Sequence, residues 1–339
     1  MRRSCFVLVA AALLLLPQAR AFGWNAVGHM ASAKIAYDQM DRDLQARVVG
    51  LLKSHPHYTT FLIAARPEGV AEPDWAVMRA ATWPDWVRSK KPGVEPDPTT
   101  FNRPADHYIN LPLIKPADKD QFDADRLRRD LPKDNVLAAL DRHAKVLASD
   151  AKAEEKAVSL CWLFHLIGDL HQPLHAVGFY SKDFPQGDRG GNLFGVTIDG
   201  EGYRLHTYWD DLMGQDPPAD YDKRDNVEYQ TKAYRLVKDC LERLHDPQYA
   251  REKFADQLAK TKFSEWADES FELARTVAYR DGELKNMPPA DVPPSPRPVP
   301  RSEVKAPEDY AKKASEVGHR RVALAGYRLA DRLKELLAK

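Results

Sequence analysis

Apolar side chains recur at intervals of three and four residues along most of the chain, which is the spacing of one face of an α-helix. The segment 155–171 is apolar almost all round, which is typical of a helix buried at the centre of a fold. Sequence that favours strands is limited to 194–198 and, more weakly, to 107–109. The predicted fold class is therefore all-α, mainly helical, with a minor β-hairpin or extended segment. Helices are expected at 26–37, 42–54, 134–149, 155–171, 226–246, 249–259, 263–282 and 306–338.

Two proline-rich stretches, 92–104 and 287–301, interrupt the helical pattern. The second would suit a linker between domains, but the 38 residues that follow it contain only one long helix. A single helix cannot bury its own apolar face, so we expect it to pack back on the core. The sequence thus predicts one domain at 24–339, with a proline-rich excursion at 287–301.

The first 23 residues have the features of a secretory signal peptide. Basic residues precede an apolar run at 6–16, and small residues follow it. The run is too short to span a bilayer, and no other stretch is apolar enough to do so, so no membrane anchor is expected after processing. Cleavage can follow Ala21 or Gly23, and the second choice makes Trp24 the new amino terminus. The sequence predicts a secreted or periplasmic protein.

The charge balance limits how a nucleic acid could be held. The chain has 50 Lys and Arg against 50 Asp and Glu, so its formal net charge is zero. This balance argues against a broad basic face, so a nucleic-acid partner would not be bound mainly by Lys and Arg. Three cysteines cannot crosslink a fold of this length. Cys161 and Cys240 remain after the signal peptide is removed, and the sequence leaves their pairing open.

Histidine and aspartate stand four residues apart at two places, His165 with Asp169 and His206 with Asp210. On a helix this spacing puts both side chains on one face, and His175 follows directly on the central helix. Imidazole and carboxylate together make half of a zinc site. In the apolar central helix, metal coordination or a buried His–Asp hydrogen bond would each offset the cost of burial. These residues alone leave both possibilities open.

A wider set of motifs decides between these possibilities. On these motifs the chain resembles the S1/P1 nuclease family, whose trinuclear-zinc nucleases share a fold with bacterial zinc phospholipase C. The matching segments follow the family order and lie at 24–29, 82–88, 106–108, 164–175, 190–192 and 206–210.

The resemblance implies three zinc ions and assigns their ligands. It gives the first ion the ligands Asp85, His107, His165 and Asp169. It gives the second ion His175, His206 and Asp210. The third ion would be held by His29 and by the α-amino nitrogen and carbonyl oxygen of Trp24, with Asp169 bridging the first and third ions. The sequence has the expected residue type at every one of these positions.

The resemblance also implies an activity. The protein is expected to be a zinc-dependent phosphodiesterase that hydrolyses single-stranded DNA and RNA to 5′-phosphate products, with 3′-nucleotidase activity left open. Asp85 would orient the attacking water, and Arg88 would stabilise charge in the transition state. Tyr108 would stack on a base. Asn110 stands where family members often carry an acid, and Asn192 is a further candidate for substrate binding. We expect a monomer whose partner is single-stranded nucleic acid.

Two other functions remain open at this stage. A zinc phospholipase C would use the same three metals on a lipid phosphodiester, although Arg88 and Tyr108 favour a nuclease. An exported, non-catalytic helical binding protein would use its His–Asp pairs only to satisfy one another.

Overall fold

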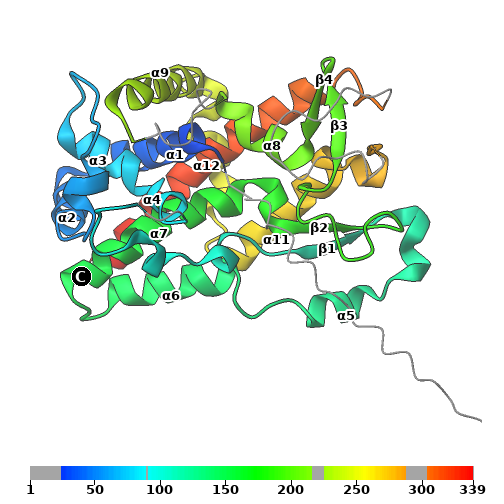
Figure 1. Ribbon diagram of the computed structural model, residues 1–339, viewed down its shortest axis with the longest axis horizontal. Helices are drawn as coiled ribbons and strands as arrows, with labels where there is room; N and C mark the ends of the chain where they lie inside the picture. Colours follow the sequence, from blue (N-terminus) through cyan, green and yellow to red (C-terminus); the bar gives the residue numbers. More distant parts are fainter. Residues whose placement is uncertain (1–23, 89–90, 216–224, 288–303, 339) are drawn as a thin grey trace, which may run out of the picture.

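The computed structural model describes residues 24–88, 91–215, 225–287 and 304–338. The predicted signal peptide lies outside these residues, and so do residues 288–301 of the second proline-rich stretch. Helices dominate the described chain (Figure 1), which confirms the predicted fold class. The helices are α1 (Ala26–Asp38), α2 (Arg42–Leu52), α3 (Glu72–Ala80), α4 (Trp83–Trp86), α5 (Ala124–Arg129), α6 (Val136–Ala148), α7 (Ala153–His171), α8 (Leu205–Asp210), α9 (Val227–Leu244), α10 (Ala255–Leu258), α11 (Phe263–Leu273) and α12 (Tyr310–Leu337).

The helix α7 is the central buried helix that the sequence predicts. Glu154 and Glu155 occupy its first turn, where negative side chains interact favourably with the helix dipole. All residues from Ser159 to His171 are buried, and the helix ends two residues before Pro173. It packs against α1, α2, α3, α4, α6, α11 and α12. Neither α7 nor any other helix in the described part of the chain is long and apolar enough to cross a membrane.

The carboxyl-terminal helix α12 returns to the core, as its apolar face requires. It lies along α1 and also packs against α7 (Figure 1). The approach to α1 is close at Gly326, because a Cβ atom at this position would lie 2.6 Å from Ile35 Cγ2. Since α1 and α7 both carry candidate metal ligands, α12 fixes the two helices relative to each other.

The strands form two small sheets. The parallel pair joins β1 (Leu111–Ile114) to β2 (Val177–Tyr180). The hairpin joins β3 (Gly195–Ile198) to β4 (Glu201–Arg204), in agreement with the predicted minor hairpin. The weaker strand prediction at 107–109 is wrong. Residues Pro104–His107 form a 3-10 turn, in which Pro104 supplies the fixed backbone angle of the first position.

Several predicted helices differ from the observed ones at their ends. The prediction at 249–259 is wrong over its first half, because Ala250 is extended and only α10 is α-helical there. The prediction at 263–282 covers α11, a π-helical turn at Ala274–Ala278 and a 3-10 turn at Arg280–Gly282. The short helices α3, α4, α5 and α8 were not expected, because each has too few turns for a clear period.

The two cysteines that the sequence left open are not bonded to each other. Cys161 on α7 and Cys240 on α9 are both free thiols and both buried. Burial raises the pKa of the Cys240 thiol to about 12, so it is protonated and unreactive near neutral pH. A disulfide therefore makes no contribution to the described fold.

Candidate metal centre

The structure brings the predicted side-chain ligands together from six separate segments. His29 comes from α1, Asp85 from α4, His165 and Asp169 from α7, and His206 and Asp210 from α8; His107 ends the turn Pro104–His107, and His175 lies in the turn Pro173–Ala176. Their ligand atoms form three groups, within each of which the atoms lie no more than 4.8 Å apart. The groups are His29, Asp85 and His165; His107, His165 and Asp169; and His175, His206 and Asp210.

The group around Asp169 forms a compact triangle of donor atoms. Asp169 Oδ2 lies 3.0 Å from His107 Nδ1 and 3.0 Å from His165 Nε2. The two imidazole nitrogens are 2.9 Å apart. An ion just above the plane of such a triangle can reach all three atoms at the bond length of about 2.0–2.2 Å that zinc prefers. All three side chains are fully buried, so bulk water does not compete for them.

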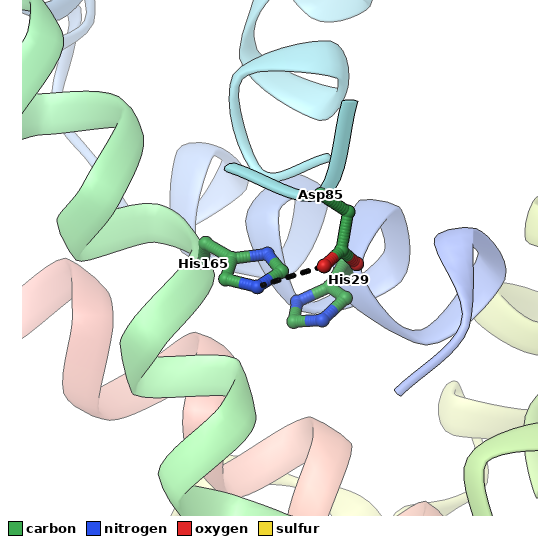
Figure 2. Close-up of side chains that lie close together, drawn as sticks. All are labelled: His29, Asp85 and His165. Carbon is green, nitrogen blue, oxygen red and sulfur yellow. Dashed lines mark ion pairs between the residues drawn. The ribbon is translucent and has the colours of Figure 1, made fainter. Parts of the chain in front are cut away.

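His29 and Asp85 lie beside His165, one member of this triangle (Figure 2). The rings of His29 and His165 stack with their centroids 4.0 Å apart, and Asp85 Oδ1 lies 3.8 Å from His165 Nε2. His29 Nε2 also lies 3.3 Å from Asp169 Oδ1. The sequence grouped Asp85 with the His107 triangle and His29 with Trp24, whereas the donor atoms place His29 in a group with Asp85. His165 belongs to both groups and so connects them.

The third group consists of His206 and Asp210 on α8 and of His175, which lies in the turn that follows the central helix α7. His206 Nε2 and Asp210 Oδ2, one turn apart on α8, are 3.5 Å from each other. The rings of His206 and His175 have their centroids 5.1 Å apart. His175 Nδ1 also lies 3.8 Å from Asp169 Oδ1, so this group adjoins the one at Asp169. The three groups form one continuous site.

Backbone carbonyl groups fix the orientation of three of the histidine rings. The Nδ1–H groups of His165, His175 and His206 donate to the carbonyl oxygens of Ala81, His107 and Gly190 at 2.7, 2.6 and 2.6 Å. A carbonyl oxygen can only accept, so Nδ1 carries a proton in each of these rings and Nε2 is the nitrogen left for a metal. This hydrogen bond to the distal nitrogen is the usual partner of a metal-binding imidazole.

Several buried donor atoms of the site have no hydrogen bond within the described residues. They are both ring nitrogens of His29, His107 Nε2 and Asp169 Oδ1. A buried polar atom without a partner costs about 1–3 kcal/mol. An ion at this site would give a partner to Asp169 Oδ1 and to one ring nitrogen of His29. His107 Nε2 lies across the ring from Nδ1, the atom of the triangle, so an ion in the triangle does not account for it.

The electrostatics of the site are those of a prepared cation site. Burial would raise the pKa of Asp169, but the facing His165 and His175 hold it well below its usual value. Burial lowers the pKa of His107 to about 3, so its ring is neutral and can act as a ligand. Burial and nearby carboxylates raise the pKa of Asp210 well above its usual value. A cation beside Asp210 would reverse that last shift.

Comparison with known protein families identifies the family of this chain. The family model described as S1/P1 Nuclease matches residues 24–338. The chain belongs to the S1/P1 nuclease family. This family is zinc-dependent, and the three groups of His and Asp in the present chain are chemically suited to zinc.

Three named nucleases are similar to this chain at low sequence identity or over a short part of its length. Nuclease S1 of Aspergillus oryzae is 26% identical over 214 residues, which are 63% of this chain and 62% of that protein. Endonuclease 3 of Arabidopsis thaliana is 26% identical over 272 residues, 76% of each chain. Nuclease P1 of Penicillium citrinum is 35% identical over 81 residues, 24% of this chain and 27% of that protein. The chain thus matches a little under two thirds of the length of Nuclease S1.

Trp24 begins the part of the chain that matches the S1/P1 nuclease family. Its indole ring is fully buried, and a Cβ atom at Gly28 would lie 2.7 Å from Trp24 Cβ, so the ring sits against the first turn of α1. The next residue, Asn25, donates its backbone N–H to the carbonyl oxygen of Asp210 at 3.2 Å. This bond ties the start of α1 to α8 and to the third group of ligands. The role of Trp24 as a ligand stays a prediction.

The candidate catalytic residues Asp85 and Arg88 are three residues apart in sequence. Asp85 lies in α4, and Arg88 follows just after the end of this helix. Arg88 Nε lies 3.1 Å from Asp85 Oδ1, and both side chains are mostly buried. The guanidinium group is therefore held beside a candidate ligand, at the edge of the metal site.

The candidate substrate residues have different environments. Tyr108 is partly exposed and follows His107 directly. Asn110 is also partly exposed and packs over Gly178, where a Cβ atom would lie 3.3 Å from Asn110 Cβ. Asn192 is buried, and its side-chain amide donates to the carbonyl oxygen of Arg189. The structure thus places Asn192 within the loop that carries Gly190, the hydrogen-bond partner of His206.

Two residues of the site were not singled out from the sequence. Gln172 donates its side-chain amide to Asp210 Oδ1 at 2.7 Å. Gly168 faces His29, because a Cβ atom there would lie 2.8 Å from His29 Nδ1. Both lie inside the segment 164–175, but a glutamine or a glycine carries no ligand signature, so only the folded arrangement reveals their roles.

Proposed function

We propose that this protein is a zinc-dependent phosphodiesterase that hydrolyses single-stranded DNA and RNA to products with a 5′-phosphate. The observation that carries the proposal is the continuous buried site in which Asp169 and His165 join three groups of His and Asp donors. Family membership and the relatives Nuclease S1 and Nuclease P1 support the same conclusion. Export through the signal peptide and a monomeric enzyme without a membrane anchor are part of the proposal.

The proposal assigns three zinc ions to this site. Asp85, His107, His165 and Asp169 would hold one ion; His175, His206 and Asp210 a second; and His29, Trp24 and Asp169 a third. When bound, the ions supply a water of lowered pKa and a positive charge that attracts phosphate. This concentrated charge provides the attraction for nucleic acid that the balanced Lys and Arg count does not.

Asp85 would act on the attacking water, and Arg88 would act on the reacting phosphate. The carboxylate of Asp85 faces the site and can accept a hydrogen bond that orients an attacking water. Arg88 offers N–H donors to the phosphate oxygens, where negative charge increases as the bond to the leaving 3′-oxygen breaks. Because the Arg88 side chain already pairs with Asp85, little ordering is needed before the reaction.

Single-strand selectivity follows from stacking at Tyr108. The ring adjoins the candidate ligand His107 and is partly exposed, so a base next to the reacting phosphate can stack on it. Base faces are available in single strands and are covered in duplexes. Asn110, two residues later, offers both a donor and an acceptor to the edge of that base.

The test is a combined metal and activity measurement on protein that begins at Trp24. We expect zinc bound in stoichiometric amounts and release of 5′-mononucleotides from single-stranded DNA and RNA. Removal of zinc with a chelator should abolish the activity, and added zinc should restore it. Phosphatidylcholine serves as the second substrate, and preferential cleavage of this lipid would replace the nuclease by a phospholipase C. Absence of zinc, with stability unaffected by chelator, would instead indicate a non-catalytic binding protein.

A further inference from the structure

Three donor groups converge on one carboxylate just before the start of α9. Lys91 Nζ and Trp86 Nε1 lie 3.1 and 3.2 Å from Asp225 Oδ2. The guanidinium group of Arg79 faces the other oxygen, with Nη2 3.9 Å from Asp225 Oδ1. Arg79 lies on α3, Trp86 on α4 and Lys91 in the segment after α4. The folded chain, and not one local run of sequence, therefore brings the donors together.

Arg79 is a buried cation whose pairing is incomplete. Its side chain is 5% exposed, and its guanidinium carbon lies 3.8 Å from the centre of the Phe61 ring. Burial lowers the pKa of Arg79 to about 10, so the group is charged at neutral pH. Its Nε has no hydrogen-bond partner in the described chain, and the 3.9 Å between Nη2 and Asp225 is too long for a hydrogen bond. Since a buried charge is normally paired and hydrogen-bonded, Arg79 lacks a close anion.

The carboxylate that faces these donors is itself loosely held. The Asp225 side chain is 44% exposed, and it directly precedes Asn226, the residue that caps α9. Ion pairs of exposed side chains contribute little to stability. A phosphodiester has one negative charge and two equivalent acceptor oxygens, as a carboxylate does. It can therefore replace Asp225 on the same donors without a change in charge.

The donors adjoin the side on which the metal site is open to solvent. The Asp85 side chain is 17% exposed, whereas no other histidine or aspartate of the three groups exceeds 8%. Trp86 follows Asp85 directly in α4, so the two Cα atoms are about 3.8 Å apart. A strand with its reacting phosphate at Asp85 and Arg88 therefore has its neighbouring phosphates within reach of these donors.

We propose that Arg79, Trp86 and Lys91 form a subsite for a phosphate of the substrate strand next to the reacting one, and that Asp225 occupies this subsite until the strand displaces it. This inference rests on the proposed function, because it concerns the same substrate. Lys91 and Trp86 donate to the phosphate oxygens, and Arg79 gains the close anion that it lacks. The subsite favours strands over substrates that contain a single phosphodiester, because only a strand supplies the second phosphate.

A single neutral methylphosphonate, moved along a short single strand, identifies the contacted phosphate. With the zinc-loaded protein, KM is expected to rise when the neutral group stands at one position other than the reacting phosphate. In Lys91→Ala that rise should shrink severalfold, because the phosphate has already lost a partner. Lys313→Ala, which breaks an exposed ion pair with Asp309, is the matched control and should retain the full rise. An equal rise in Lys91→Ala and in the unmodified protein would overturn the proposal.

Asp225→Ala separates a competing carboxylate from an ion pair that only stabilises the fold. Removal of the competitor should lower KM for the strand severalfold, with the zinc content unchanged. A purely structural ion pair predicts an unchanged or raised KM, and either result would overturn the proposal. Asp309→Ala is the matched control, because Asp309 also pairs with an arginine and a lysine and is 46% exposed. This control should leave KM for the strand unchanged.

The salt dependence of KM distinguishes this inference from the proposed function. Each phosphate of a single strand that a protein neutralises adds about 0.7 to the slope of log affinity against log salt concentration. The slope of log(1/KM) should therefore be smaller by about 0.7 in Lys91→Ala and unchanged in Lys313→Ala. Absence of cleavage of any strand would contradict the proposed function and, with it, the strand as occupant. Cleavage with the same slope in Lys91→Ala and in the unmodified protein would contradict the subsite alone.

Discussion

The side-chain amide of Gln172 donates a hydrogen bond to Asp210 Oδ1 over 2.7 Å. The same side chain accepts from the backbone N–H of Leu174. Gln172 therefore holds the Asp210 carboxylate against the turn that carries His175, and leaves Oδ2 directed to His206. A partner of this kind fixes the orientation of a ligand before the metal arrives.

Replacement of Gln172 by leucine should weaken zinc binding at the group of His175, His206 and Asp210. The expected loss of affinity is about 10–100-fold, which is typical when the hydrogen-bond partner of a ligand is removed. Zinc retained after dialysis against graded chelator measures it. Gln121→Leu, at an exposed position, is the matched control and should retain zinc normally. Equal retention by both variants would show that Gln172 does not position the ligand.

Gly168→Ala should displace His29. The added Cβ atom would lie 2.8 Å from His29 Nδ1, closer than side chains normally approach. We expect loss of zinc from the group that contains His29, together with loss of activity. Helix propensity acts in the opposite direction, since alanine is about 1 kcal/mol more favourable than glycine in a helix.

The control for Gly168 is another helical glycine with open space around it. Nothing lies within 4 Å of a Cβ atom at Gly50 on α2. Gly50→Ala should therefore keep full zinc content and gain about 0.5–1 kcal/mol in free energy of unfolding. If Gly168→Ala also bound zinc normally, the close contact with His29 would have no functional meaning.

The long helices and the ligand set could be predicted from the sequence for different reasons. The helix α7 was predictable because few polar residues interrupt the apolar run from Ala157 to Leu170. The short helices α4 and α8, which carry Asp85, His206 and Asp210, are too short for such a signal, and their ligands were found by motif resemblance instead.

What could not be predicted depends on contacts between distant segments. The carbonyl group of Ala81 lies 84 residues before its partner His165, and no local pattern indicates this bond. The sharing of His165 between two groups of donors likewise appears only when α1, α4 and α7 come together. The strand predicted at 107–109 lies too early in the chain, because His107 still ends the 3-10 turn that Pro104 begins and the pairing with β2 starts only at Leu111.

Arg88→Ala should lower kcat and leave the zinc content unchanged. Removal of one donor to the charge of a transition state costs about 10²–10³ in kcat. Arg88→Lys should recover part of the loss, because a lysine keeps the charge but not the forked geometry. Arg126→Ala, at an exposed position on α5, is the control. Loss of zinc from Arg88→Ala would instead show that the residue stabilises Asp85 as a ligand.

Acid should destabilise the zinc-free protein partly through His143. Its pKa is lowered by burial from 6.5 to about 3, so between these values the unfolded chain binds a proton that the folded chain does not. The stabilising contribution is complete above about pH 6.5 and falls by about 1.4 kcal/mol for each pH unit below it. In urea unfolding between about pH 6 and pH 4, His143→Phe should show a correspondingly smaller slope. Identical slopes for the two proteins would contradict a buried neutral ring.

The amino terminus offers the last prediction. Trp24 is buried, and Asn25 is held to Asp210, so the chain enters the site at a fixed point. A free α-amino group has a pKa of about 8 and can lose its proton to bind zinc, whereas a peptide nitrogen cannot. Protein that begins at Trp24 should therefore hold one more zinc ion than protein with additional residues before Trp24. Metal analysis of both forms measures this difference.

The matched control carries the same additional residues after Lys339 and should bind zinc as the processed protein does. Restoration of the missing ion when a protease removes the amino-terminal extension would assign the effect to the free amine. Equal zinc content and equal activity with and without that extension would show that Trp24 is not a ligand. In that case His29, Asp85 and His165, whose ligand atoms lie within 4.8 Å of one another, would have to hold their ion without the terminus.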